Sequence, residues 1–402
     1  MPYVLSLLLI LMFSPALGDP APQTTKQAIS RLVEGAKQAN SDALLVMRGG
    51  KVLAEYRSST APSGPIPLMS VTQSVVGLAI GLLVREGKLA SLDTPVHQYF
   101  PEWRQGRKQQ VTVRMLMNHT SGLQNEPNPE DEIYPAKDVV QLALSAELAT
   151  APGEEFNYNN KAVNLLTAVV GKAAGMPVDR YLQQSLFEPL GIQPGEWARD
   201  AAGNPLGMVG LAMSAADLAK LGQLVLDEGQ WQGKEMIPAE FVRQMLSPQR
   251  DCAECGLLWW RSLIWMDLRV APFATEKLRV AGVSDAIVAG FTKLQGQRFS
   301  SFGDFFDALR GTVGEDGQGL MDREVTGRNL KTTDVLSIIN GPMLYHGSGD
   351  LGQFLVVVPG AKVVAVRQVA SLDEVYGEEG VDAFIQQVTA LAATLDPALR
   401  RK

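Results

Sequence analysis

The chain has 402 residues, 46% of them hydrophobic and 20% charged, with a formal net charge of −7 at pH 7. This composition is typical of a globular protein with a sizeable core and excludes a disordered chain. The acidic balance offers no basic surface for nucleic acid and no polybasic patch for a membrane. The only three histidines are far apart in the sequence, so we expect no metal site and no cofactor.

The first residues read as a targeting segment. Residues 4–13 (VLSLLLILMF) form an apolar run that is short for a bilayer span, and a Pro and small residues follow it. This plan predicts a secretory signal peptide over residues 1–18, although no Lys or Arg precedes the run; an uncleaved anchor is the alternative. We therefore expect an exported protein, periplasmic or secreted, with no membrane span in the mature chain.

The element pattern predicts an α+β fold in which one antiparallel sheet is built from both termini and flanked by helices. A helix is expected at 26–40, followed by a β-hairpin of strands 43–47 and 52–56. Two strands around Pro359-Gly360 and a helix at 381–395 are expected near the other end. Five further helices predict a mostly helical second lobe, at 70–87, 112–116, 138–149, 162–174 and 214–227. We interpret residues 19–402 as one domain with a long insertion at about 261–340.

Ser70 opens the most apolar of these helices. At the first turn, free backbone N–H groups and the helix dipole favour negative charge, as a nucleophile needs. Residue 73 lies on the same helix face and can reach the Ser70 hydroxyl. Ser is also a favoured N-cap residue, so a purely structural role is the alternative.

Five further segments occur in a fixed order along the chain. They are 115–123 (MLMNHTSGL), 152–160 (PGEEFNYNN), 187–192 (FEPLGI), 210–218 (GLAMSAADL) and 352–359 (GQFLVVVP). Together with Ser70 they resemble the β-lactamase-related serine hydrolases, of the penicillin-binding-protein and class C β-lactamase type. The Gly352-Gln353 pair that begins the last segment, and the pair Trp259-Trp260, resemble the branch that includes 6-aminohexanoate-dimer hydrolase.

The resemblance implies a role for each matched position. Ser70 falls on the nucleophile, Tyr158 on the phenol that relays its proton, and Asn160 on the amide that holds substrate and neighbouring side chains. The third element falls on residues 347–349, including Ser348 and Gly349, and the backbone N–H of Asp350 then joins that of Ser70 in an oxyanion hole. In a shifted register, His346 takes the basic position of this element instead.

The chain departs from the family pattern at Gln73, where the resemblance implies a lysine. A glutamine amide forms hydrogen bonds but accepts no proton near neutral pH, and an unassisted serine is a weak nucleophile. Three interpretations stay open: a slow hydrolase that relies on Tyr158, a hydrolase with another base such as His346 or Asp350, or a non-catalytic binding protein. The expected partner is a small molecule with an amide, ester or β-lactam bond; the sequence gives no oligomeric state.

Two other features have a structural interpretation beside a chemical one. His119 lies in a segment that is a structural loop in the family, which favours a hydrogen-bonded core histidine over a triad base. Cys252 and Cys255 form a lone C-x-x-C pair, which is too small for a zinc site. A local disulfide and two reduced thiols are both compatible with that pair.

Overall fold

The computed structural model describes residues 24–250, 252–314, 316–370 and 379–401. The expected signal peptide over residues 1–18 lies outside this range. The described chain divides into two compact units, which we call the main unit (Gln23–Ser262 and Met343–Leu395) and the small unit (Leu263–Pro342 and residues 396–401). No helix among the described residues is long and apolar enough to cross a membrane.

The main unit is organised around a six-stranded antiparallel sheet in the order β2-β1-β12-β11-β10-β7. The sheet thus joins a hairpin near the start of the chain to strands near its end, as the sequence predicts. The strands are β1 (Ala43–Arg48), β2 (Lys51–Arg57), β7 (Trp260–Leu263), β10 (Met343–Gly349), β11 (Gln353–Val358) and β12 (Val363–Gln368). β11 and β12 are buried at every position because helices cover both of their faces.

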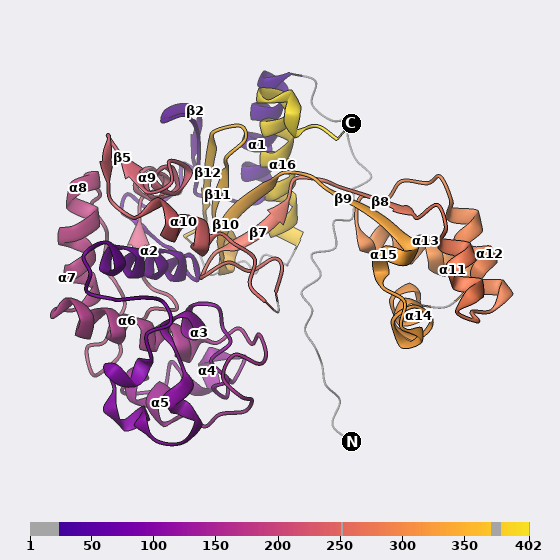
Figure 1. Cartoon of the computed structure of the whole chain (residues 1–402). Helices are drawn as coiled ribbons and strands as arrows, with labels where there is room; N and C mark the ends of the chain where they lie inside the picture. The colour runs from indigo at the N-terminus through magenta and orange to yellow at the C-terminus, as the bar shows by residue number, and fades with distance from the viewer. Residues whose placement is uncertain (1–23, 251, 315, 371–378, 402) are drawn as a thin grey trace. The chain divides into compact units, whose positions relative to one another are not determined.

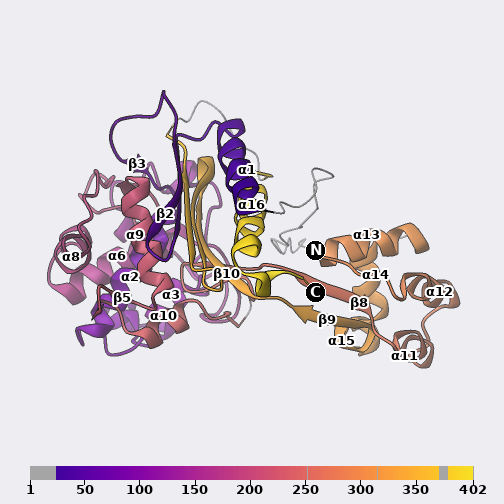
Figure 2. The same ribbon diagram turned by 90° about the horizontal axis from the view of Figure 1, so that it is seen from above.

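Figure 2 shows how the helices of the main unit are divided between the two faces of this sheet. α1 (Thr25–Gln38) and α16 (Glu379–Leu395) pack against each other on one face. α9 (Ala215–Leu226) and α2 (Val71–Arg85) cover the other face. α2 has 13 buried residues, as its largely apolar sequence requires; Thr72, Gln73 and Ser74 are its buried polar residues.

The remaining α-helices of the main unit surround α2 (Figure 1). They are α3 (Val113–Met117), α4 (Pro129–Glu132), α5 (Val139–Ser145), α6 (Asn160–Ala174), α7 (Val178–Leu182), α8 (Glu188–Leu190) and α10 (Ala239–Met245). In the view of Figure 1, α3, α4, α5 and α6 lie below α2. The main unit also has two short antiparallel strand pairs: β3 (Ile66–Pro67) pairs with β4 (Ala212–Met213), and β5 (Gln230–Trp231) pairs with β6 (Lys234–Glu235). The mixed fold with a helical lobe agrees with the sequence prediction.

One helix is shorter than predicted. The pattern predicts a helix to residue 149, whereas α5 ends at Ser145. After it the chain pairs with a distant loop: Leu148 bridges Leu123, and the Gln124 N–H donates to the Glu147 carbonyl at 2.8 Å. These non-local hydrogen bonds replace the last turn of the helix.

The small unit has its own core. β8 (Met266–Val270) pairs with β9 (Leu336–Asn340), and Phe291 and Phe305 are fully buried among its helices. Those helices are α11 (Ala274–Val280), α12 (Asp285–Leu294), α13 (Phe302–Val313), α14 (Gly317–Glu324) and α15 (Thr332–Val335). The carboxylate of Asp267 pairs with three guanidinium groups, those of Arg269, Arg298 and Arg401, and they hold its pKa well below the usual range.

Candidate active site

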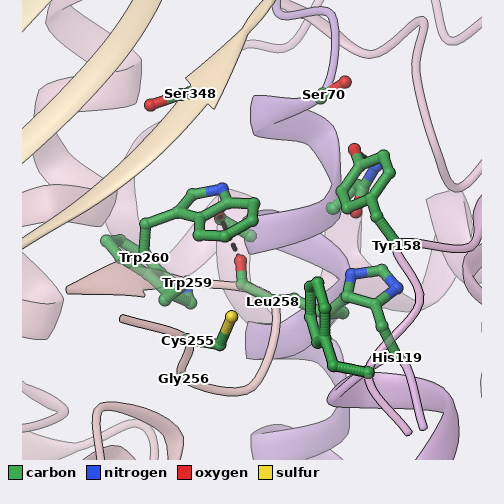
Figure 3. Close-up of a pocket in the computed structure, with 12 residues that line it drawn as sticks. Ser70, His119, Tyr158, Cys255, Gly256, Leu258, Trp259, Trp260 and Ser348 are labelled. Atoms are coloured by element: carbon green, nitrogen blue, oxygen red, sulfur yellow. Dashed lines mark hydrogen bonds between the residues drawn. The ribbon is translucent and has the colours of Figure 1, made fainter. Parts of the chain in front are cut away.

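A pocket open to solvent lies in the main unit, next to the N-terminal end of α2 (Figure 3). Twelve residues line it: Ser70, Gln73, Ser74, His119, Phe156, Tyr158, Cys255, Gly256, Leu258, Trp259, Trp260 and Ser348. Four of the predicted site residues are among them, from three separate parts of the chain. The fold therefore brings Ser70, Gln73, Tyr158 and Ser348 into one cavity.

Ser70 precedes the first residue of α2, and its hydroxyl does not cap the helix. It faces the pocket that the Tyr158 phenol also lines; burial raises the pKa of this phenol, and the neighbouring Ser70 side chain lowers it. Met69 before it has a φ of 47°, in the left-handed region that side chains seldom adopt. This turn presents Ser70 to the pocket, so the purely structural N-cap alternative does not describe its side chain.

Gln73, one helical turn later, is almost fully buried and its amide nitrogen faces three oxygen acceptors. It donates to the phenol oxygen of Tyr158, and it lies 3.3 Å from Asn160 Oδ1 and 3.5 Å from the Met208 carbonyl. Asn160 is the first residue of α6, where the side chain of Asn159 caps the helix by accepting from the Ala162 N–H. The residues at the predicted tyrosine and asparagine positions thus meet at the Gln73 side chain, and Ser70 lines the same pocket.

Tyr158 lies between two other rings. The His119 ring is 4.7 Å from it, and the Trp260 ring stacks on it at 6.3 Å with an interplanar angle of 23°. Burial, with a smaller contribution from the Asp350 carboxylate, raises the pKa of the phenol above its ordinary value of 10.0. The phenol is therefore protonated at neutral pH, ready to donate a proton and poor at accepting one.

His119 is a buried core histidine, as the sequence analysis favours. Its Nδ1 accepts the backbone N–H of Asn159 at 3.1 Å, which anchors the backbone next to Tyr158. Burial lowers the pKa of the imidazole to about 4, so the ring is neutral at physiological pH.

The third predicted element is the end of β10, which passes close to Ser70. A Cβ added to Gly349 would lie 2.9 Å from the Ser70 nitrogen and 2.8 Å from the Leu68 carbonyl oxygen. Only glycine permits this approach. Ser348 lines the pocket, and Asp350 is exposed and begins a 3-10 turn. Gly349, the last residue of the predicted third element at 347–349, therefore lies beside Ser70. The oxyanion role of the Asp350 N–H stays a prediction.

His346, the basic residue of the shifted register, lies behind Ser348. Its Nδ1 is 2.8 Å from Ser348 Oγ and its Nε2 is 3.2 Å from Ser262 Oγ. Burial lowers the pKa of the ring to about 3. A ring with this pKa is neutral at pH 7 and a weak proton acceptor, and it reaches the pocket only through the Ser348 hydroxyl.

The sequence analysis missed one wall of the pocket. This wall is the loop from Cys255 to Trp260, which enters β7. Cys252 and Cys255 form a disulfide within it, which selects one of the two alternatives for this pair. Leu258 has a φ of 61°, and its carbonyl accepts the Ser74 hydroxyl at 2.8 Å. The Trp pair beside the cysteines was the available signal for this wall.

A family model matches almost the whole length of the chain. The model of the Beta-lactamase family matches residues 26–386. The chain belongs to the Beta-lactamase family. It is thus a member of a family of serine hydrolases, which agrees with the resemblance found in its sequence segments.

Two curated proteins that match the chain share only about a quarter of its residues over the matched part. The 6-aminohexanoate-dimer hydrolase of Paenarthrobacter ureafaciens is 27% identical over 237 residues, covering 54% of this chain and 59% of that protein. Protein flp of Staphylococcus aureus is 25% identical over 185 residues, covering 41% of this chain and 37% of that protein. The matched part of the chain spans less than two thirds of the length of either relative.

Solved structures confirm the Beta-lactamase fold. A penicillin-binding protein homologue from Caulobacter crescentus superposes with a TM-score of 0.57 at 15% identity, covering 93% of this chain and 100% of that chain. A class C β-lactamase mutant superposes with a TM-score of 0.56 at 17% identity, covering 90% and 96%. At these identities the likeness concerns the fold alone.

Proposed function

We propose that the chain is an exported serine hydrolase that cleaves amide, ester or β-lactam-type bonds through an acyl intermediate on Ser70. The observation that carries the proposal is that Ser70 and Tyr158 line one pocket, in which the Gln73 amide donates a hydrogen bond to the Tyr158 phenol. Membership of a serine hydrolase family supports the same reaction class. Export rests on the apolar run at residues 4–13, and the Cys252–Cys255 disulfide is compatible with an oxidising compartment.

In the proposed reaction, Ser70 Oγ attacks the substrate carbonyl carbon, and the backbone N–H groups of Ser70 and Asp350 stabilise the oxyanion. The Ser70 proton leaves through the Tyr158 phenol, which passes a proton to the leaving nitrogen or oxygen as the bond to it breaks. Water then attacks acyl-Ser70 by the same path in reverse, releasing the acid and restoring the serine.

Gln73 orients the phenol in this scheme but takes no proton. General-base assistance typically contributes about 10²–10⁴-fold, so a rate reduced by an amount of that order is expected. Orientation and the oxyanion hole still act without a base, and such sites retain measurable catalysis. The proposal is therefore a hydrolase with reduced activity.

The second candidate is a binding protein for peptide-like or acylated small molecules. Gln73 is the observation that favours it, since the nitrogen that meets Tyr158 and Asn160 belongs to an amide and not to a titratable amine. In this case the pocket would hold its ligand without forming a bond to Ser70.

A labelling experiment separates the two candidates. Wild type and Ser70→Ala are treated with a fluorophosphonate probe and assayed on a p-nitrophenyl ester and on 6-aminohexanoate dimer. The hydrolase predicts labelling and turnover in wild type and neither in Ser70→Ala. A folded wild type that does not label and does not turn over would support the binding protein. Turnover that persists in Ser70→Ala would refute the role of Ser70.

A further inference from the structure

The pocket wall contains no charged side chain among the residues that the structure describes. Its polar groups are the hydroxyls of Ser70, Ser74 and Ser348, the phenol of Tyr158, the amide of Gln73, the imidazole of His119 and the indole N–H groups of Trp259 and Trp260. The remaining wall is aromatic or apolar, with two tryptophans. A substrate carboxylate would thus meet no ammonium or guanidinium at this wall, and it would lose hydration without a partner ion.

The two histidines near the pocket do not supply a positive charge either. His119 lies in the wall and His346 lies directly behind Ser348. Burial lowers their pKa values to about 4 and about 3, respectively. Both rings are therefore neutral across the pH range in which the protein is expected to work.

A negative charge, by contrast, acts on the pocket. Asp350 directly follows Gly349, whose backbone lies against the Ser70 nitrogen, and its side chain is exposed. Burial is the main cause that raises the pKa values of the Tyr158 and Tyr134 phenols, and the Asp350 carboxylate adds a smaller rise to each. A field that disfavours the phenolate of Tyr158 also disfavours an anionic group bound beside it.

Trp260 adds an aromatic face to the same wall. Figure 3 shows its indole between Ser348 and the Ser70–Tyr158 side of the site, and the ring stacks on Tyr158. The ring is only partly buried. An indole face attracts cations and apolar groups through its quadrupole and its surface, and it repels anions.

We propose that this pocket selects substrates whose acyl group is uncharged or cationic, and discriminates against those with a carboxylate on the acyl side of the scissile bond. Asp350 is the specificity-determining residue, and Trp260 provides the surface that receives the uncharged or cationic group. The kinetic test rests on the proposed hydrolase function, whereas a second test of the same electrostatics needs no turnover.

The kinetic test uses three p-nitrophenyl esters of similar length: the neutral butyrate, the anionic hemisuccinate and the cationic γ-trimethylammonio-butyrate. In wild type, kcat/KM for the neutral ester should exceed that for the hemisuccinate by about tenfold at low salt, because one unscreened charge near Tyr158 contributes on that order. Added salt should reduce this ratio. A hemisuccinate that reacts as fast as the butyrate would overturn the proposal.

Variants locate the cause of the selectivity. Asp350→Asn should reduce the neutral-to-anionic ratio several-fold and Asp350→Lys should invert it, because each change makes the local potential more positive. The ratio within one variant is independent of any general loss of activity. Glu240→Gln removes an exposed carboxylate on α10 and serves as the matched control, with no change in the ratio expected. An unchanged ratio in Asp350→Lys would refute the role of Asp350.

The second test reads the potential at Trp260 directly. The Trp260 fluorescence, taken as wild type minus Trp260→Phe, is quenched by caesium, iodide and neutral acrylamide, with acrylamide correcting for access. Each ion's quenching constant is divided by its constant for free N-acetyltryptophanamide; on this scale caesium should quench more strongly than iodide, and Asp350→Lys should reverse that order. If no ester is hydrolysed, the hydrolase function fails and the quenching decides this inference. If esters are hydrolysed but iodide quenches as well as caesium, the inference fails and the hydrolase stands.

Discussion

The side-chain amide of Gln73 donates a hydrogen bond to the phenol oxygen of Tyr158. The same nitrogen lies within 3.5 Å of two further acceptors, Asn160 Oδ1 and the Met208 carbonyl. An amide nitrogen carries two hydrogens, whereas an ammonium group carries three. Position 73 therefore has the surroundings that a lysine would satisfy, and this relationship yields the first prediction.

Gln73→Lys should raise kcat/KM for a neutral p-nitrophenyl ester by about 10²-fold, because the amine can accept the serine proton or stabilise the Tyr158 phenolate. Gln73→Met, of similar length and without hydrogen-bonding hydrogens, is the matched control and should lower the rate. Both variants are compared with wild type by steady-state kinetics after thermal melts establish that they fold. A folded Lys variant with wild-type rates would contradict the idea that residue 73 limits catalysis.

The pH dependence of the wild type should reflect the Tyr158 phenol. Its pKa lies above 10.0 because of burial, so the proton-accepting phenolate is scarce at neutral pH and becomes more abundant as the pH rises. We expect kcat/KM to increase continuously with pH across the neutral and alkaline range. Gln73→Lys should move this increase to lower pH, since an adjacent ammonium favours the phenolate. Tyr158→Phe should abolish the dependence; a profile that Tyr158→Phe leaves intact would assign it to another group.

Much of the architecture was predictable because its signals are local. The hairpin of β1 and β2 follows from alternation around a Gly-Gly turn, and the burial of α2 follows from its largely apolar sequence. The meeting of Ser70, Tyr158 and Asn160 followed from the resemblance to a family, since no spacing rule brings residues 88 or more positions apart together. The structure supplies that proximity through the packing of α2 against α6.

Other parts of the site depend on tertiary contacts that the sequence does not encode locally. Trp260 stacks on Tyr158 only because β7 joins the edge of the sheet beside β10. The neutral state of His346 depends on its complete burial behind Ser348, and a sequence gives no burial for a single histidine. This burial is why His346, one of the alternative bases, is a weak proton acceptor in the folded protein.

Gly349→Ala tests the close approach of β10 to Ser70. The new methyl group would lie within 3.0 Å of backbone atoms of Leu68 and Ser70, so one of the two segments must move. We expect at least tenfold loss of kcat/KM, because displacements of about an ångström are costly at an active site. Gly311→Ala, in α13 with no atom near its added Cβ, is the control and should leave activity intact. Wild-type kinetics in Gly349→Ala would contradict this account of the third element.

The last prediction concerns the buried cation next to Asn160. Lys161 has 1% of its side chain exposed, and its ammonium binds both carboxylate oxygens of Glu132 at 2.7 Å. Glu132→Gln leaves this ammonium buried without its counter-charge, and we expect about 3 kcal/mol less free energy of unfolding in urea titrations. Lys161→Met with Glu132→Gln removes both charges and should recover most of that loss. The ion pair joins α4, which holds Glu132, to α6, which holds Lys161. A single variant as stable as wild type would contradict a stabilising role for this ion pair.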